Sequence, residues 1–329
     1  MPVSHPPRLA VLAVALVLAS GCAANADNAT SGGATRVVNA DNGAITVPAD
    51  PKRVIATGYA VPVLIESGAA LVGISSWKRG LAMMSPEHRA TYDGMAKVAG
   101  ELAKETNYEA IASAKPDLIV IGVPKPVLAD IDMKRLQSIA PVVAIGPNAP
   151  FEWREQSRRQ ADAAGRAQDF DRAKAAYDKK AADLAAKYTN ALRDLKFGHV
   201  GGYGDASAGN FQREFAGSWG TNVAGDVGVK YYGEVKKKGP GSESVSEYSS
   251  IEELPASLGQ ADAITYTLDP DGTPGASVKH VLESPLWTNL PAVKAGRVFP
   301  IRYTQASTYA SAMSTLDSLD QALAPLLTR

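Results

Sequence analysis

The sequence predicts an α/β protein of two lobes joined by one long helix, and three observations support this prediction. Short apolar segments alternate with helix-like segments in both halves of the chain, which is typical of mostly parallel sheets covered by helices. The stretch between the halves, residues 152–195, contains no proline and is rich in Ala, Lys, Arg, Asp and Gln. A short polar unit recurs once in each half. At 329 residues, the chain is long enough for two domains with sizeable cores.

The composition excludes several classes of function. The 34 Lys and Arg balance the 34 Asp and Glu, so the net charge offers no electrostatic footprint for a nucleic acid. A single Cys rules out an intramolecular disulfide, a Cys-based zinc site and an all-Cys iron–sulfur cluster. The histidines at positions 88, 199 and 280 are widely separated, so we expect neither a metal site nor a resident cofactor.

Residues 1–21 have the pattern of a lipoprotein signal peptide. Arg8 provides a basic start, and the apolar run of residues 9–19 is too short to span a bilayer as a helix. Small residues stand directly before Cys22, which resembles a bacterial lipobox, although Ala19 occupies a position that is usually Leu. We therefore expect Cys22 to carry a lipid and to become the first residue of the mature chain.

The alternative for the N-terminus is an ordinary signal peptide that is cut later, at Ala24 or Ala26. Residues 22–35 are small and polar without apolar periodicity, so we expect a flexible tether. In either case the product is expected to work outside the cytoplasmic membrane, with no further membrane-spanning segment.

The first lobe is predicted at residues 36–150. A hairpin is expected around Asn42, because strand-like residues flank an Asp-Asn-Gly turn signal. After it, buried strands are expected at residues 53–57, 71–75, 117–121 and 141–145, and helices at residues 61–68, 107–115 and 127–139.

Linking helices are predicted at residues 151–195. Apolar residues such as Phe170, Tyr177 and Leu184 recur near helical spacing. We expect two helices with a break near residues 165–169, and the second should run from residue 169 to residue 190 over about 30 Å.

The second lobe is predicted at residues 196–329, and it repeats the alternation of the first. Strands are expected at residues 199–203, 263–267 and 297–301, and helices at residues 218–225, 251–258, 278–282 and 308–327. The predicted fold class is therefore α/β, with two Rossmann-like lobes of mostly parallel sheet joined by one long α-helix.

Each lobe carries the same short unit, in which a hydroxyl residue is followed three residues later by Glu and then by an Asp before an apolar strand. Thr106 and Glu109 begin the unit in the first lobe, and Ser249 and Glu252 begin it in the second. The local interpretation is a capping box at a helix start, with Glu253 as an alternative to Glu252. Capping alone does not explain why the unit occurs once per lobe.

Three segments resemble a known family, and they are residues 53–57 (RVIAT), 108–119 (YEAIASAKPDLI) and 286–298 (LWTNLPAVKAGRV). With the lipobox and the mid-chain helix, they are similar to the iron–siderophore substrate-binding lipoproteins of ABC importers. These are the helix-hinged, class III periplasmic binding proteins. The resemblance covers roughly residues 36–328.

The resemblance implies a binding protein and not an enzyme. Such a protein captures a ferric siderophore between its lobes and delivers it to the permease dimer of an ABC importer. We expect a monomer that its lipid anchors on the extracytoplasmic face of the cell membrane. Glu109 and Glu252 match the residues that dock into arginine pockets of the permease, since Arg binds carboxylates through paired hydrogen bonds. Within the same fold, haem, cobalamin or another metal chelate is the alternative ligand.

Ligand contacts are expected from loops that follow strands, because the cleft of such a fold lies at the carboxyl ends of parallel strands. The aromatic and basic residues at these positions are Tyr59, Trp77, Arg79, Arg213, Trp219, Tyr232, Arg302 and Tyr303. Aromatic rings would cover the faces of a bulky chelate, and Arg would meet its oxygens through charge-assisted hydrogen bonds. The alternative for each residue is a place in the core or a pair with a nearby acid.

Motifs of common enzyme and metal-binding classes are missing. The sequence has no Gly-x-x-x-x-Gly-Lys-Ser/Thr loop, no Gly-x-Ser-x-Gly elbow and no His-Glu-x-x-His pair. Residues 269–272 resemble half of a calcium loop but lack its later Glu, so we interpret them as a turn. Two other classes stay open. One is an extracellular hydrolase whose catalytic residues converge only in the fold, and the other is a surface protein that binds a protein partner.

Overall fold

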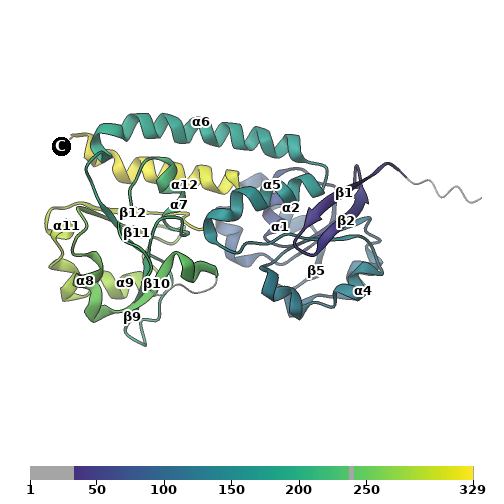
Figure 1. Ribbon diagram of the computed structural model, residues 1–329, viewed down its shortest axis with the longest axis horizontal. Coiled ribbons are helices and arrows are strands. Elements are labelled where there is room, and N and C mark those ends of the chain that lie inside the picture. Colours follow the sequence, from purple (N-terminus) through teal and green to yellow (C-terminus); the bar gives the residue numbers. More distant parts are fainter. Residues whose placement is uncertain (1–32, 237–240, 329) are drawn as a thin grey trace, which may run out of the picture. The chain divides into compact units, whose positions relative to one another are not determined.

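The computed structural model describes residues 33–236 and 241–328, which form the α/β fold that the sequence predicts (Figure 1). The predicted signal peptide, the lipid on Cys22 and most of the predicted tether lie outside the described residues. Of the helices in the described ranges, none combines the length and the apolar content that a membrane span requires.

The sheet of the first lobe is entirely parallel, with the strand order β5-β4-β3-β6-β7. Its strands are β3 (Val54–Gly58), β4 (Leu71–Ser75), β5 (Lys97–Ala99), β6 (Leu118–Gly122) and β7 (Val142–Ala144). Every residue of β6 and β7 is buried, as expected for apolar strands in a sheet with both faces covered. An antiparallel hairpin, β1 (Thr35–Ala40) and β2 (Gly43–Pro48), precedes the sheet and confirms the predicted turn.

The helices of the first lobe are short. They are α1 (Ala60–Glu66), α2 (Pro86–Gly94), α3 (Tyr108–Ser113) and α4 (Met133–Gln137), with 3₁₀ turns at Lys78–Met83, Ala103–Glu105, Lys125–Asp130 and Pro150–Glu152. The prediction of one helix at residues 127–139 is wrong. Ile131 is extended, and Asp132 caps a new helix by accepting a hydrogen bond from the Arg135 amide at 3.1 Å.

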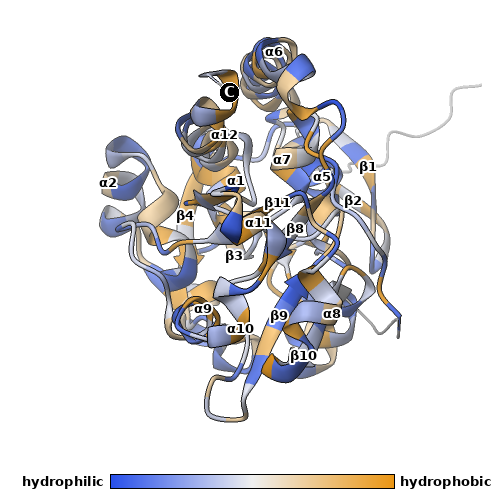
Figure 2. Cartoon of the chain, turned by 90° about the vertical axis from the view of Figure 1, so that its left-hand side faces the viewer, coloured by the Kyte–Doolittle hydropathy of each residue, from blue (hydrophilic) through white to orange (hydrophobic). Residues whose placement is uncertain are grey.

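Two helices link the lobes, with the break that the sequence predicts. α5 (Trp153–Ala163) and α6 (Ala167–Leu192) are separated at Gly165, whose φ of +71° suits glycine. α6 packs along α12 (Tyr309–Leu323), and the two helices lie side by side in Figures 1 and 2. The Tyr188 hydroxyl of α6 donates a hydrogen bond to the Asp320 carboxylate of α12 at 2.6 Å.

The sheet of the second lobe is mixed, with the strand order β10-β9-β8-β11-β12. Its strands are β8 (Phe197–Val200), β9 (Asn210–Glu214), β10 (Ser246–Ser250), β11 (Ala263–Thr267) and β12 (Val298–Ile301). β8, β11 and β12 run parallel, whereas β9 joins one edge antiparallel to β8, and β10 then pairs antiparallel with β9. The sequence does not predict β9, because it buries Gln212, Arg213 and Glu214, residue types that usually indicate an exposed segment.

The four helices predicted for the second lobe are present, one of them shifted, and two short helices, α10 (Pro285–Thr288) and α11 (Pro291–Lys294), were not predicted. The predicted four are α7 (Asn222–Asp226), α8 (Leu254–Leu258), α9 (Ala276–Leu282) and α12, with 3₁₀ turns at Gly241–Ser244, Ile251–Glu253 and Ala324–Thr328. α7 begins four residues later than predicted. The preceding residues form a turn in which the Thr221 hydroxyl accepts a hydrogen bond from the Ser218 amide at 2.9 Å.

One hydrophobic core joins both sheets to the linking helices. It includes Val54 and Val120 of the first sheet, Phe299 of the second, Trp153 of α5 and Leu316 of α12. Because the core is shared, the described residues form one compact unit from residue 34 onward. The predicted lobe boundaries near residues 150 and 195 therefore stay predictions.

Candidate ligand-binding site

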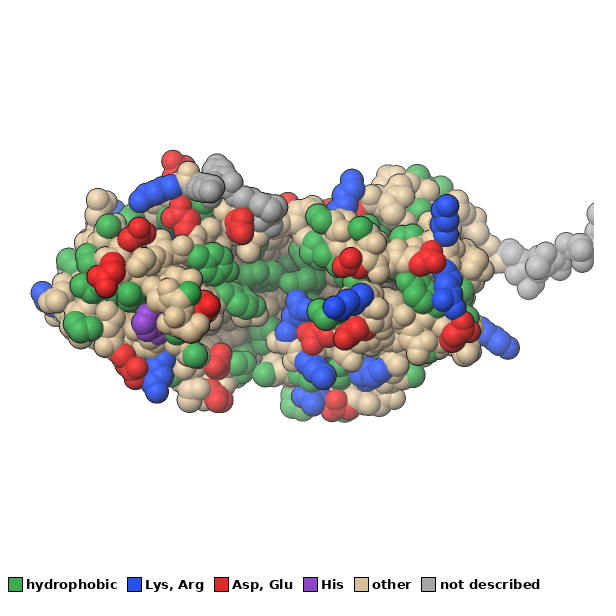
Figure 3. All heavy atoms as spheres, turned by 90° about the horizontal axis from the view of Figure 1, so that it is seen from below, with side chains coloured by type: hydrophobic (Ala, Val, Ile, Leu, Met, Phe, Trp, Pro, Cys, Tyr) green, Lys and Arg blue, Asp and Glu red, His purple; other side chains and the backbone are tan. Residues whose placement is uncertain are grey.

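A cavity lies where strand-end loops of the first lobe face the second lobe. Its volume is about 590 Å³, within the range of small-molecule sites. Tyr59 follows β3, the second lobe contributes Trp219, Ser242 and Glu243, and four prolines line the loops after β6 and β7 (Pro124, Pro126, Pro147 and Pro150). Figure 3 shows hydrophobic side chains gathered in the hollow between the lobes. The cavity wall is therefore mainly apolar, and its prolines restrict the backbone.

Three aromatic rings from both lobes meet one another, and two of them, Tyr59 and Trp219, line this cavity. The Tyr59 and Trp77 rings meet edge-on with centroids 4.8 Å apart, and the Tyr59 and Trp219 rings are parallel within 3° at 6.1 Å. The Arg79 guanidinium lies 5.0 Å from the centre of the Trp77 ring. Four of the eight predicted ligand residues thus come together, and we call Tyr59, Trp77, Arg79 and Trp219 the aromatic cluster.

The backbone at the end of β3 fixes Tyr59 at the cavity. The Tyr59 amide donates a hydrogen bond to the Gly122 carbonyl, at the end of β6, over 2.7 Å. A Cβ on Gly122 would lie 2.2 Å from the amide nitrogen of Ala60, so only glycine lets α1 begin this close to the sheet. Burial raises the pKa of the Tyr59 hydroxyl, although the charge of Arg79 opposes the shift. Tyr59 is therefore a neutral phenol that can both donate and accept hydrogen bonds.

Trp77 supports the aromatic cluster from inside the lobe, while Arg79 reaches solvent. Trp77 is only 4% exposed, and its amide donates to the Tyr92 hydroxyl at 2.9 Å. The Nε of exposed Arg79 lies 2.8 Å from a carboxylate oxygen of Glu101. An exposed ion pair contributes only about 0–1 kcal/mol, so Arg79 can exchange Glu101 for a ligand oxygen at little cost.

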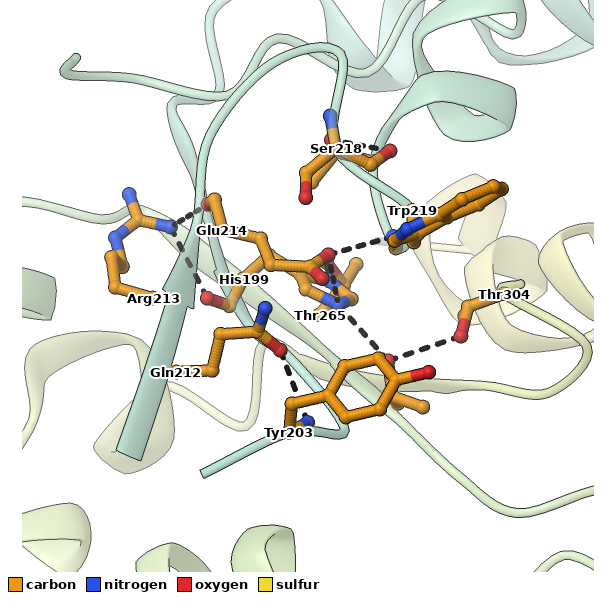
Figure 4. A network of polar contacts seen from close by, with 12 residues as sticks. His199, Tyr203, Gln212, Arg213, Glu214, Ser218, Trp219, Thr265 and Thr304 are labelled. Atoms are coloured by element: carbon orange, nitrogen blue, oxygen red, sulfur yellow. Dashed lines mark hydrogen bonds and ion pairs between the residues drawn. The ribbon is translucent and has the colours of Figure 1, made fainter. Parts of the chain in front are cut away.

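Trp219 reaches the cavity by a different route from Tyr59. β9 runs antiparallel to β8, with Arg213 opposite Val200, the last residue of β8, so the chain leaves β9 in the direction of the start of β8. Residues 215–221 then fold over the sheet face that carries His199 (Figure 4). A Cβ on Gly220 would lie 2.0 Å from His199 Nε2, so the loop packs directly on this face.

His199 and Glu214 belong to a buried polar network under this loop, drawn in Figure 4. His199 Nε2 and Glu214 Oε2 are 3.5 Å apart, and the two imidazole nitrogens contact the hydroxyls of Thr265 at 2.7 Å and Thr267 at 3.2 Å. Burial raises the pKa of Glu214 to about 7. Burial, assisted by the charge of Arg213, lowers the pKa of His199 to about 3. At neutral pH a neutral imidazole therefore stands beside a carboxyl group near its titration midpoint.

Arg213 and Tyr232 are not brought to the aromatic cluster. Successive side chains of a strand point to opposite faces, so Arg213 faces away from the side of the sheet that Glu214 occupies. Buried Arg213 donates to the backbone carbonyls of Glu214 at 2.7 Å and Tyr232 at 3.1 Å. The Tyr232 hydroxyl donates to the Ser257 carbonyl of α8 at 2.6 Å. Both side chains thus hold the interior of the second lobe together.

Arg302 and Tyr303 follow β12 as predicted, and the structure pairs them with each other and not with the aromatic cluster. The Arg302 guanidinium lies 5.4 Å from the centre of the Tyr303 ring. Tyr303 has a φ of +60°, which is rare for a residue with a side chain, and its carbonyl accepts a hydrogen bond from the Thr315 hydroxyl at 2.6 Å.

Two parts of the site escape the sequence prediction. The first is Tyr203, which follows β8, is 47% exposed and donates a hydrogen bond to Gln305 Oε1 at 2.9 Å. Burial raises its pKa, and Tyr59 and Arg79 also act on it, so Tyr203 stands near the aromatic cluster. The second is the set of prolines in the cavity wall. Both lie in loops that follow strands, but the sequence prediction placed Tyr203 inside the strand at residues 199–203.

Glu109 and Glu252 stand at the starts of helical segments, one in each lobe, and both are exposed. Their caps differ from the predicted capping boxes. Asn107, and not Thr106, caps α3, and Ser250 caps the 3₁₀ turn that contains Glu252. The glutamate side chains are thus not occupied in the predicted reciprocal bonds.

A second cavity, of about 520 Å³, is formed by helices α5, α6, α7 and α12 and not by strand-end loops. Its charges are largely paired, Arg154 with Asp226 and Lys174 with Asp178. Among the residues that the structure describes, no group of three or more His, Cys, Asp or Glu could hold a metal ion. The strand-end cavity with the aromatic cluster is therefore the stronger candidate for a ligand site.

Comparisons with known proteins agree with this architecture. Residues 57–208 match the family described as periplasmic binding protein. The iron(3+)-hydroxamate-binding protein FhuD of Bacillus subtilis is 28% identical over 309 residues, which cover 89% of each chain. The protein named probable siderophore-binding lipoprotein YfiY, from the same organism, is 30% identical over 190 residues, which cover 56% of each chain.

A solved structure extends the likeness to three dimensions. The siderophore periplasmic binding protein from the fuscachelin gene cluster of Thermobifida fusca has a TM-score of 0.67 and 28% identity, over 85% of this chain and 98% of that one. The fold, the family match and the full-length relatives agree with one another. Residues 57–208 of this chain therefore resemble the periplasmic binding protein family, and its fold is similar to that of a siderophore periplasmic binding protein.

Proposed function

We propose that this chain captures a ferric siderophore in the strand-end cavity and delivers it to an ABC importer. The observation that carries the proposal is the aromatic cluster, in which Tyr59 and Trp219 from different lobes stack 6.1 Å apart beside a cavity of about 590 Å³. The printed names of the relatives, which bind iron(3+)-hydroxamate or siderophores, support the same ligand class.

The chemistry of the cavity suits such a ligand. A ferric siderophore is bulky, partly apolar and often anionic, so aromatic rings and prolines cover its faces. Arg79 meets its oxygens through charge-assisted hydrogen bonds once Glu101 is displaced. The iron stays inside its chelator and takes no ligand from the protein.

In this proposal the eight predicted ligand residues form two groups, one beside the ligand and one away from it. Tyr59, Arg79 and Trp219 contact the chelate, and the buried Trp77 ring packs against Tyr59 and Arg79 and supports them. The other four act indirectly, Arg213 and Tyr232 as supports of the second lobe and Arg302 and Tyr303 as part of the loop after β12.

A binding panel tests the ligand class. Tryptophan fluorescence of residues 23–329 is titrated with ferrioxamine B (a ferric trihydroxamate), a ferric tris-catecholate, ferric citrate, haem and cobalamin. We expect saturable quenching by one ferric chelate, which is weakened in Tyr59→Ala. Selective saturation by haem or cobalamin would replace the siderophore with that ligand, and no binding across the panel would overturn the proposal.

Delivery requires two further sites. We propose that Glu109 and Glu252 dock on the permease dimer, because both are exposed and each begins a helical segment of a different lobe. Glu109 now pairs with exposed Arg135, a contact that a permease arginine would replace. The double variant Glu109→Ala, Glu252→Ala should keep its ligand affinity and lose transport, whereas loss of both together would refute the docking role.

The lipid anchor is also part of the proposal, and it places the protein on the extracytoplasmic face of the cell membrane. Cys22→Ser should release a folded protein into the soluble fraction. Retention of this variant in the membrane fraction would refute lipid attachment at Cys22.

A further inference from the structure

One carboxylate fastens the loop that carries Trp219 to the sheet beneath it. Glu214 Oε2 accepts a hydrogen bond from the Gly220 amide at 2.6 Å, and Gly220 directly follows Trp219. Such a short N–H···O contact is typical of an ionised acceptor. A Cβ on Gly220 would lie 2.5 Å from the same carboxylate oxygen, so a larger residue at this position would displace the loop or the carboxylate.

The other contacts of this loop do not change charge. The Thr221 hydroxyl closes the loop on itself by donating to the Phe215 carbonyl at 2.6 Å. On the helix side, the Asn222 side chain donates to the Trp219 carbonyl at 3.2 Å and to the Ser218 carbonyl at 2.7 Å. Of these fastenings, only the one made by Glu214 can be switched by a proton.

The groups that face Glu214 leave it as the titrating member of the network near neutral pH. The ionisable groups coupled to it are His199 of β8, Arg213 of β9, Tyr203, Tyr231 and Tyr248. The pKa of His199 is lowered to about 3 by burial and Arg213, and burial raises the pKa values of the three tyrosines. Burial alone brings the pKa of Glu214 to about 7 against the opposing Gly220 amide, Ser218 hydroxyl and Arg213 charge.

We infer that Glu214 is a positioning residue for Trp219, and that the ionised carboxylate draws the Gly220 amide and the indole into the cavity wall whereas the protonated form releases them. The driving force is the difference between a charge-assisted hydrogen bond and a neutral one, which is roughly half as strong. Trp219 is half-buried at the cavity, so the loop can shift without opening the core.

The inference adds a pH response to the proposed function. Only the expected effect on ligand affinity rests on that function. If Trp219 contacts the chelate, affinity should rise several-fold from acidic to alkaline pH, with the same midpoint as the movement of the indole. The movement itself needs no ligand and is therefore tested without one.

The test is ¹⁹F NMR of the ligand-free protein labelled with 5-fluorotryptophan. The four tryptophans give four resonances, and Trp219→Phe identifies the one of interest. We expect this resonance to shift with pH around a midpoint near 7 and to become independent of pH in Glu214→Gln. Glu66→Gln is the matched control, because burial also raises the pKa of Glu66 to about 7, while Glu66 accepts its hydrogen bond from the Thr308 hydroxyl at 2.5 Å and not from the Trp219 loop.

The outcomes are separable. A flat Trp219 resonance in the wild-type protein overturns the inference even if Glu214→Gln does not fold, and so does an unchanged titration in a folded Glu214→Gln. If the Trp219 resonance no longer titrates in Glu66→Gln, the responsible carboxylate is Glu66 and not Glu214, and the inference is overturned as well. The affinity for ferrioxamine B, measured in parallel across the same pH range, tests the proposed function separately. A protein that shows the Trp219 titration but binds no chelate keeps the inference and loses the function.

Discussion

Each lobe provides one wall of the cavity, and we call these the first wall and the second wall after their lobes. The two walls carry similar aromatic side chains but are stabilised in different ways. On the first lobe, Tyr59 follows a parallel strand, and the nearby charges of Arg79 and Glu101 pair at the surface. On the second lobe, Trp219 sits on a loop folded over the sheet, and Glu214 and His199 lie in the interior beneath it. The difference comes from one strand direction, since β9 runs antiparallel to β8 and the loop that follows it turns back over the sheet and covers the polar side chains of His199 and Glu214. The first wall is therefore held by packing, and the second by a polar network that responds to pH.

The largest effect on stability is expected from a substitution in the first wall. Trp77→Ala removes a ring that is 4% exposed, contacts Tyr59 edge-on and supports Arg79. A buried Trp→Ala change should cost about 3–5 kcal/mol in the free energy of unfolding. Urea denaturation measures the loss, and Trp77→Phe should recover much of it because a ring remains. A loss below about 1 kcal/mol would mean that packing does not hold this wall.

The next effect tests the polar network of the second wall through the pH dependence of stability. The pKa of Glu214 is about 7 in the folded state, above its ordinary value of 4.5, so the folded protein binds more protons between these pH values. The contribution of Glu214 to the free energy of unfolding therefore falls as pH rises from about 4.5 to 7 and stays low above that. His199, with a folded pKa of about 3, gives the opposite slope below its ordinary pKa of 6.5.

Comparison with a variant isolates Glu214 from the other groups. Between pH 5 and pH 8, Glu214→Gln should gain stability relative to the wild-type protein by up to about 3 kcal/mol. Chemical denaturation of both proteins at several pH values gives the difference. A difference that does not change with pH would contradict an interior carboxylate that titrates near neutrality.

A pair of glycine substitutions probes the same wall sterically. Gly220→Ala would force a Cβ to within 2.0 Å of His199 Nε2, whereas a Cβ on Gly225 of α7 meets nothing within 4 Å. Overpacking should cost Gly220→Ala about 1–3 kcal/mol, and Gly225→Ala should gain about 0.5–1 kcal/mol from helix propensity. Thermal denaturation ranks the two, and equal melting temperatures would argue against close packing of the loop on the sheet.

The smallest expected effect on stability separates structure from binding on the first wall. Arg79→Gln breaks an exposed ion pair with Glu101, so the free energy of unfolding should change by less than about 1 kcal/mol. The affinity for ferrioxamine B should nevertheless fall, because a charge-assisted contact to ligand oxygen is lost. An unchanged affinity would remove Arg79 from the ligand contacts.

Sequence patterns predict the first lobe better than the second for a physical reason. Four of its five strands are largely buried apolar runs that are visible on their own, as in residues 118–122, whereas the short strand β5 was not predicted. β9 contains Gln212, Arg213 and Glu214, whose burial depends on partners from distant parts of the chain. Local periodicity carries no information about such partners. The helix predicted at residues 127–139 is wrong for a related reason, because the Asp132 side chain caps the start of a new helix and so interrupts the predicted one.

The same limit explains the division of the predicted site. Tyr59, Trp77, Arg79 and Trp219 lie together, as expected for residues near strand ends, and Tyr59 and Trp219 line the cavity. Arg213 was placed with them because β9 was not recognised, and the face to which a strand residue points cannot be assigned without the strand. The prolines of the first wall were visible in the sequence, but their role depends on how closely the loops after β6 and β7 approach each other.

We expect both walls to contact the same ligand molecule. A double-mutant cycle with ferrioxamine B tests this most directly. Dissociation constants are measured for the wild-type protein, Tyr59→Ala, Trp219→Ala and the double variant. Each single change should weaken binding by about 10-fold or more. The double change should cost less than the sum, because the two rings stack on each other. Wild-type affinity in either single variant would contradict a site shared between the lobes.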